Sequence, residues 1–126
     1  MKNISTPAYV YQYLDNLGNV IYVGSTFDYE KRDYEHKVSD KWYWQVSSFL
    51  IAETKSRTDA LAIESHYISV LKPKHNKLQK EYGELSELPH IKWLTPEQYK
   101  VSLNNRVKRE MMKAENILRY KPLERN

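Results

Sequence analysis

The sequence contains no cysteine, only three glycines in 126 residues, and no long hydrophobic run. Without cysteine the chain cannot form disulfide bonds or thiolate metal sites. A membrane helix needs roughly 18 to 20 consecutive apolar residues, and no stretch of the sequence approaches that length. The chain also opens without a signal-peptide pattern, so we expect a cytoplasmic protein that does not enter a membrane.

Over most of the chain, the numbers of basic and acidic side chains nearly balance. Residues 1–77 carry 10 basic and 9 acidic side chains, and residues 78–94 carry two and three. Residues 95–126 carry eight basic and four acidic side chains, which accounts for the net charge of +4. We therefore expect one nearly neutral domain at 1–77, followed at 78–126 by a linker and a basic helical extension.

The residue pattern predicts strands and helices in alternation. The two β-rich segments 8–14 and 19–24 are joined by the polar tetrad "DNLG", as in a hairpin. Segment 25–38 predicts a helix capped by Thr26 or Asp28, and segment 44–54 predicts a third strand.

Two further helices are expected. The clearer one runs over 58–73, with Thr58 or Asp59 as its cap and Pro73 as its stop. The other starts at the capping box "TPEQ" and runs to about Tyr120. Its apolar stripe consists of Leu103, Val107, Met111, Ala114 and Leu118.

Two tyrosines fall within the predicted hairpin. If "DNLG" forms a four-residue loop, Tyr11 lies directly opposite Tyr22 and both phenols share one face of the sheet. Gly24 shares that face, where its missing side chain would leave room for the backbone of a ligand. Such a pair on its own favours simple packing.

Three charged or titratable residues follow the hairpin. Arg32 and His36 lie four residues apart and so project from one helical face. Glu64 lies within the predicted apolar stripe of its helix, which comprises Ala60, Leu61, Tyr67, Ile68 and Leu71. A buried carboxylate needs a partner. Both an ion pair, for instance with Arg32, and a hard metal ion such as Mg²⁺ stay open at this point.

These residues together resemble the GIY-YIG nuclease family. The segments "YVY" at 9–11 and "YVG" at 22–24 correspond to its two strand motifs, and Arg32, His36, Glu64 and Asn76 follow in the family's order. The likeness covers about residues 8–77. The sequence departs from the first motif, because Tyr9 replaces its glycine and Val10 its isoleucine.

The resemblance implies an α/β (α+β) fold with a small three-stranded antiparallel sheet flanked by helices. It also implies metal-dependent hydrolysis of phosphodiester bonds, most often in DNA. Tyr11 would be the general base, and His36 and Tyr22 would lower its pKa. Arg32 would bind the scissile phosphate, and Glu64 would hold one Mg²⁺ or Mn²⁺ at the leaving oxygen.

Other residues are given supporting roles or none. Asn76 is expected to support the site by hydrogen bonds. The residues predicted to contact substrate are Gly24, Lys31, Lys72, Lys74 and His75. The three tryptophans favour packing over base stacking, and His66 and His90 are expected to take no part.

Alternatives to an active nuclease are a nucleic-acid-binding module without turnover and a protein-binding scaffold. The C-terminal helix is expected to pack on the core, to follow DNA phosphates, or to form a homodimer.

Overall fold

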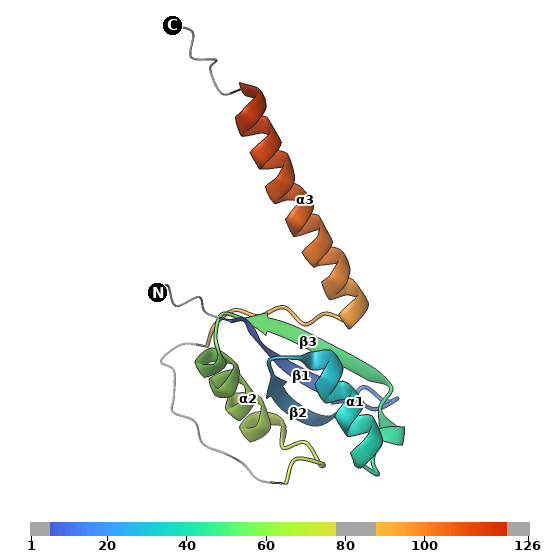
Figure 1. Ribbon diagram of the computed structural model, residues 1–126. Helices are drawn as coiled ribbons and strands as arrows, with labels where there is room; N and C mark the ends of the chain where they lie inside the picture. The colour runs from blue at the N-terminus through green and yellow to red at the C-terminus, as the bar shows by residue number, and fades with distance from the viewer. Residues whose placement is uncertain (1–5, 78–87, 121–126) are drawn as a thin grey trace, which may run out of the picture. The chain divides into compact units, whose positions relative to one another are not determined.

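The computed structural model describes residues 6–77 and 88–120. Its elements, in chain order, are strands β1 (Ala8–Leu14) and β2 (Val20–Thr26), helix α1 (Tyr29–Ser39), the 3-10 turn η1 (Tyr43–Gln45), strand β3 (Ser48–Thr54), and helices α2 (Arg57–Leu71) and α3 (Pro96–Tyr120). The expected three-stranded antiparallel sheet with flanking helices is confirmed (Figure 1).

The sheet has the order β2-β1-β3, so β1 is central and β2 forms one edge. Because side chains alternate along a strand, β1 serves two layers. Ala8 and Val10 join the apolar core that α2 completes with Ala60 and Ile63. The tyrosines of β1, at positions 9, 11 and 13, lie on the opposite face, which α1 covers.

Asp33 anchors α1 to the sheet. Its Oδ1 atom accepts hydrogen bonds from the hydroxyls of Tyr13 and Tyr43, both at 2.7 Å. Tyr13 is fully buried, and a buried hydroxyl needs such a partner. This carboxylate therefore fixes the position of the helix that carries Arg32 and His36.

The predicted register of the β1–β2 hairpin is wrong. Tyr11 pairs with Gly24, and Tyr13 pairs with Tyr22. The loop is longer than "DNLG" because Asp15 N–H bonds to the carbonyl of Asn19 at 2.9 Å, and the ladder is irregular between Tyr13 and Leu14. The pairing register is shifted by two residues, so Tyr11 and Tyr22 still lie on the same face of the sheet, as predicted. The Tyr11 and Tyr22 rings stack with centroids 6.1 Å apart.

The helix caps match the sequence only in part. Asp28 caps α1 by accepting from Lys31 N–H at 3.1 Å, as one of the two alternatives predicted. The cap of α2 is Ser56, which accepts from Asp59 N–H at 3.2 Å, so neither Thr58 nor Asp59 is the cap. Helix α2 ends at Leu71, with Lys72 in the left-handed conformation.

The chain divides into two compact units, Met1–Thr95 and Pro96–Asn126. Leu94 pairs with Ile51 of β3 through backbone hydrogen bonds of 2.7 and 2.9 Å, within the first unit. The expected division of the chain at residue 77 stays a prediction. Part of the predicted linker, residues 78–87, lies outside the described residues.

Helix α3 starts and ends where the sequence predicts. The side chains of Leu103, Val107 and Met111 are exposed along it, as is Ala114. The side chain of Leu118 is outside the described set. No described helix is both long and apolar enough to span a membrane.

Candidate active site

A cleft of about 270 Å³ opens at the β2 edge of the sheet. Its walls come from segments far apart in the sequence: one strand, two helices and the residues after each helix. The lining residues are Tyr22, Arg32, His36, Asp40, Trp42, Glu64, Ile68, His75 and Lys77. Four of the six positions predicted as catalytic therefore share this cleft, and Tyr11 reaches it through a hydrogen bond to His36.

Tyr11, His36 and Asp40 form a continuous hydrogen-bonded chain. The Tyr11 hydroxyl lies 2.6 Å from His36 Nε2, and His36 Nδ1 lies 2.5 Å from Asp40 Oδ2. A carboxylate can only accept, so Nδ1 carries the imidazole proton. In neutral His36 the Nε2 lone pair is then free to accept the Tyr11 hydroxyl proton.

The electrostatics of this chain favour a neutral Tyr11 and a neutral His36 at rest. Burial raises the pKa of the Tyr11 phenol well above its ordinary value, and Tyr22 adds to the rise, whereas the charge of Arg32 lowers it. Burial lowers the pKa of His36, against the opposing effect of Asp40. The expectation that Tyr22 lowers the pKa of Tyr11 is therefore wrong, because like-charge repulsion opposes ionisation of two neighbouring phenols.

An aromatic wall bounds the cleft. The Tyr22 ring stacks on Trp42 at 5.2 Å between centroids, and Trp42 stacks on His75 at 4.8 Å with planes 7° apart. His75 Nε2 lies 2.9 Å from Gln45 Oε1, which fixes the ring further. The wall gives the cleft a rigid side.

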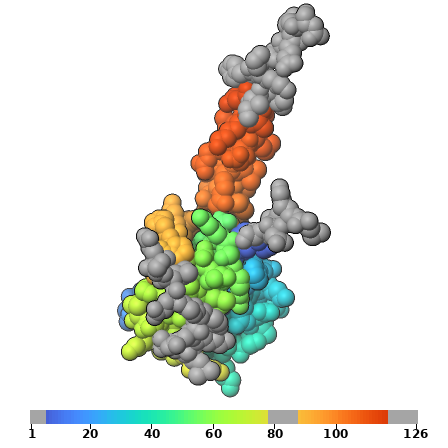
Figure 2. Space-filling model, turned by 90° about the vertical axis from the view of Figure 1, so that its left-hand side faces the viewer, coloured from blue at the N-terminus to red at the C-terminus, as the bar shows by residue number. Residues whose placement is uncertain are grey.

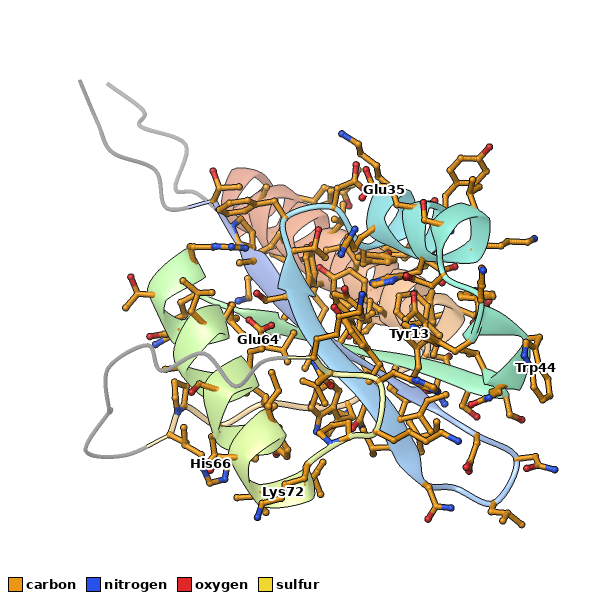
Figure 3. The ribbon with its side chains drawn as sticks, turned by 90° about the horizontal axis from the view of Figure 1, so that it is seen from below. Tyr13, Glu35, Trp44, Glu64, His66 and Lys72 are labelled. Carbon is orange, nitrogen blue, oxygen red and sulfur yellow. The ribbon has the colours of Figure 1, made fainter. Side chains whose placement is uncertain are left out.

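Glu64 reaches the cleft from α2. In Figure 3 it points toward β2, while His66 on the same helix points away, as expected for a residue with no part in the site. The Oε1 atom of Glu64 accepts a hydrogen bond from Ser25 Oγ at 2.8 Å. The predicted stripe around Glu64 is shifted, since Leu71 is exposed whereas Ile63 is buried, and Glu64 is half-buried at the stripe's edge.

Glu64 suits a hard divalent ion. Mg²⁺ commonly takes one or two carboxylates and completes its shell with water and substrate phosphate. Among the described residues, no group of three or more His, Asp and Glu side chains is placed to hold a metal. A carboxylate at the wall of an open cleft fits a metal that the substrate helps to bind.

Arg32 lies at the border between this cleft and a second hollow. It lines both, and its Nη1 atom pairs with Glu35 Oε1 at 3.1 Å. The Arg32 side chain is 41% exposed, so a phosphate can reach it. Glu35 holds the guanidinium in place without sealing it from solvent.

Asn76 supports the edge strand. Its side-chain amide accepts from Val23 N–H at 3.0 Å and donates to the Val23 carbonyl at 2.9 Å. His75 N–H donates to the Ile21 carbonyl at 3.0 Å. The segment after α2 thus satisfies the edge strand's backbone groups, which would otherwise be unpaired. It also holds His75 and Lys77 at the cleft.

Some predicted substrate residues do not reach the cleft. A Cβ atom on Gly24 would clash with the hydroxyl and ring of Tyr11. The room expected there for a ligand is therefore taken by Tyr11 itself, and that prediction is wrong. Lys72 and Lys74 are exposed and belong to the lining of neither hollow, while His75 lines the cleft and Lys31 the second hollow.

Four residues of the site were not predicted from the sequence: Asp40, Trp42, Ser25 and Lys77. Asp40 carried a usable signal, because it follows His36 by four residues and such pairs meet on a helix. Trp42 and Ser25 carried none, since their positions depend on how distant segments pack.

Comparison with known proteins agrees with the sequence resemblance. The model of the GIY-YIG catalytic domain matches residues 7–79. Among curated relatives, UvrABC system protein C is 33% identical over 88 residues in Shewanella denitrificans and 35% over 88 residues in Shewanella putrefaciens. The Legionella pneumophila protein is 35% identical over 79 residues.

These matches cover 57% to 64% of this chain and only 13% to 14% of each relative's length. No solved structure matches the chain significantly.

Proposed function

The chain belongs to the GIY-YIG nuclease family, and on that premise we propose that it is a metal-dependent endonuclease that hydrolyses phosphodiester bonds in DNA. The observation that carries the proposal is the Tyr11–His36–Asp40 hydrogen-bonded chain beside a cleft that also holds Arg32 and Glu64. This arrangement combines a route for a proton, a cation for a phosphate and a carboxylate for a metal.

Tyr11 is the general base, and it acts by passing its own proton on. An attacking water gives a proton to the Tyr11 oxygen while the hydroxyl proton of Tyr11 moves to Nε2 of His36. The new P–O bond forms as the bond to the leaving oxygen breaks, and His36 becomes an imidazolium. Asp40 then faces a positive charge at 2.5 Å, which stabilises that form. This route avoids a free phenolate, which burial disfavours.

The remaining groups act on the phosphate. Arg32 places its planar guanidinium against two phosphate oxygens. A Mg²⁺ or Mn²⁺ ion held by Glu64 would stabilise negative charge on the leaving oxygen. Ser25 orients the Glu64 carboxylate, and Asn76 keeps the β2 edge in place. His75 and Lys77 line the cleft, where they would contact flanking phosphates.

The test is cleavage of single-stranded, duplex and branched DNA by wild type and Glu64→Ala with Mg²⁺ or Mn²⁺. We expect cleavage by the wild type and its loss in Glu64→Ala, with Glu30→Ala as the control for an exposed glutamate. DNA binding without cleavage, equal in both proteins, would favour a binding module. No nucleic-acid affinity would favour a scaffold.

A further inference from the structure

Phe27 is an apolar ring on the surface next to the cleft. It is 51% exposed and lies just before α1. It lines an open hollow of about 440 Å³ whose walls come from the end of β2, the first part of α1 and the start of α2. Figure 2 shows the green surface of β3 and the start of α2 bordering the cyan surface of α1.

The hollow combines an aromatic face with positive charge. Lys31, Arg32 and Arg57 line it, and the Arg57 guanidinium lies 5.6 Å from the centroid of the Phe27 ring. The two acidic residues in its wall have other partners, since Asp28 caps α1 and Glu35 pairs with Arg32. An exposed ring beside cations is the combination that binds an unpaired base and its phosphate.

The hollow adjoins the candidate active site at two points. Arg32 lines both spaces. Ser25 lines the hollow and donates its hydroxyl to Glu64, which lines the cleft. A strand whose phosphate binds Arg32 in the cleft has its neighbouring nucleotide within reach of the hollow, because consecutive nucleotides are covalently joined.

We propose that this hollow binds the nucleotide next to the scissile phosphate, with its base stacked on Phe27 and its phosphate on Lys31 and Arg57. The proposal rests on the proposed nuclease function. It assigns a substrate subsite to residues outside the catalytic cleft. It also requires an unstacked base at that position, so the preferred substrates contain a single-stranded nucleotide there.

The first test measures binding without cleavage. Fluorescein-labelled single-stranded, duplex and branched DNA oligonucleotides are titrated in EDTA with wild type, Phe27→Ala, Phe27→Trp and Arg57→Gln. Tyr34→Ala and Lys37→Gln are matched controls, since both side chains are exposed on α1 and line neither hollow. Circular dichroism checks that each variant is folded.

Phe27→Ala is expected to weaken binding of single-stranded DNA about 5-fold to 100-fold with an unchanged salt dependence. Phe27→Trp should restore it. Arg57→Gln should reduce the slope of log affinity against log salt by about 0.7 on single strands. Both controls should bind like the wild type. Wild-type affinity in Phe27→Ala, or no binding of any oligonucleotide by the wild type, would overturn the proposal.

The second test finds the position of the stacked base. A series of oligonucleotides, each with one abasic site, is bound by wild type and Phe27→Ala. One abasic position should weaken wild-type binding and have no further effect on Phe27→Ala, because that variant has no ring on which the base could stack. Equal effects in both proteins at every position would contradict the subsite.

The two proposals fail differently. If the wild type cleaves DNA while Phe27 and Arg57 variants bind and cleave normally, the subsite is wrong and the nuclease function stands. If the variants lose affinity while no metal supports cleavage by the wild type, the hollow is a nucleotide-binding site of a protein without turnover, and the nuclease function is wrong.

Discussion

At the scale of single residues, the protonation of His36 controls the proposed reaction. Its pKa is lowered by burial, so the imidazole is neutral at pH 7. Only the neutral form can take the Tyr11 proton. We therefore predict that wild-type kcat/KM falls as the pH drops, with a midpoint below about 6.5, the ordinary histidine value. A midpoint above that value would contradict a neutral acceptor.

Asp40→Asn is predicted to lower the rate and shift the same pH profile. The carboxylate raises the pKa of His36 by its hydrogen bond and charge, so its removal moves the acid midpoint to lower pH. The maximal rate should fall about 10-fold to 100-fold, because the imidazolium loses its partner and its tautomer is no longer fixed. The measurement is kcat/KM between about pH 5 and pH 8.

Unchanged DNA affinity in EDTA would show that Asp40 acts on proton transfer and not on binding. A lower rate with no shift of the midpoint would mean that Asp40 has only a structural role.

Gly24 is the residue whose substitution should most directly displace Tyr11. A methyl group there overlaps the Tyr11 phenol, which Tyr13 and Phe49 enclose at 5.6 and 5.9 Å between ring centroids. Gly24→Ala should therefore cost about 1–3 kcal/mol of unfolding free energy. It should also reduce cleavage at least about 100-fold, since the hydrogen bond to His36 is disturbed.

Gly18→Ala is the matched control for Gly24→Ala. A Cβ atom on Gly18 would lie in open space. Because the φ of Gly18 is 84°, alanine there costs about 1–2 kcal/mol in backbone strain. Cleavage by Gly18→Ala should stay normal at a temperature where the protein is folded. Equal activity in the two variants would rule out the steric argument.

At the scale of strands and helices, most elements could be predicted from the sequence, but the register of the hairpin could not. Alternating apolar residues and a capping residue were enough for the strands and α1. The hairpin register failed because it depends on side-chain bonds: Asp15 Oδ1 accepts from Leu17 and Asn19 N–H at 3.0 and 2.9 Å. Those bonds lengthen the loop, and composition does not reveal them.

The same limit applies to the candidate site. Residues one helical turn apart, such as His36 and Asp40, can be paired from sequence spacing. Ser25 and Glu64 lie 39 positions apart and meet only after α2 packs on the sheet. The pKa of Tyr11 likewise depends on burial, which a sequence pattern does not quantify.

Asn76 tests how a short segment supports the edge of the sheet. Asn76→Ala removes both hydrogen bonds to Val23 and should cost about 1–3 kcal/mol. Asn76→Asp keeps the acceptor for Val23 N–H but places a carboxylate against the Val23 carbonyl, so it should also destabilise the fold. Thermal unfolding followed by circular dichroism measures both changes, with the exposed Asn16→Ala as control. A wild-type melting temperature in Asn76→Ala would contradict this role.

At the scale of the whole molecule, the two units differ in composition and burial. The first unit has an apolar core of its own, and its hydrogen-bonded site is built from residues 11–77. In the second, the described side chains of α3 beyond residue 102 are exposed. Its described surface carries exposed basic side chains and exposed apolar side chains. We therefore propose that the first unit carries out catalysis and that the second adds affinity for DNA.

Replacing Lys108, Arg109 and Lys113 by glutamine in the full chain tests this assignment. If these side chains follow DNA phosphates, the slope of log affinity against log salt should fall by about 0.7 to 0.9 for each phosphate that is no longer neutralised. Affinity should drop at low salt, whereas kcat at saturating DNA should stay unchanged because the cleft is intact.

Glu110→Gln with Glu115→Gln is the control of opposite charge, and it should strengthen binding at low salt. Dimerisation is the alternative role of α3. Sedimentation of wild type and Val107→Glu, a change to an exposed residue of the apolar stripe, tests for it. If the wild type sediments as a dimer and Val107→Glu as a monomer with weaker binding, α3 raises affinity by pairing two copies. An unchanged salt slope in the variants of Lys108, Arg109 and Lys113 would refute phosphate contact by α3.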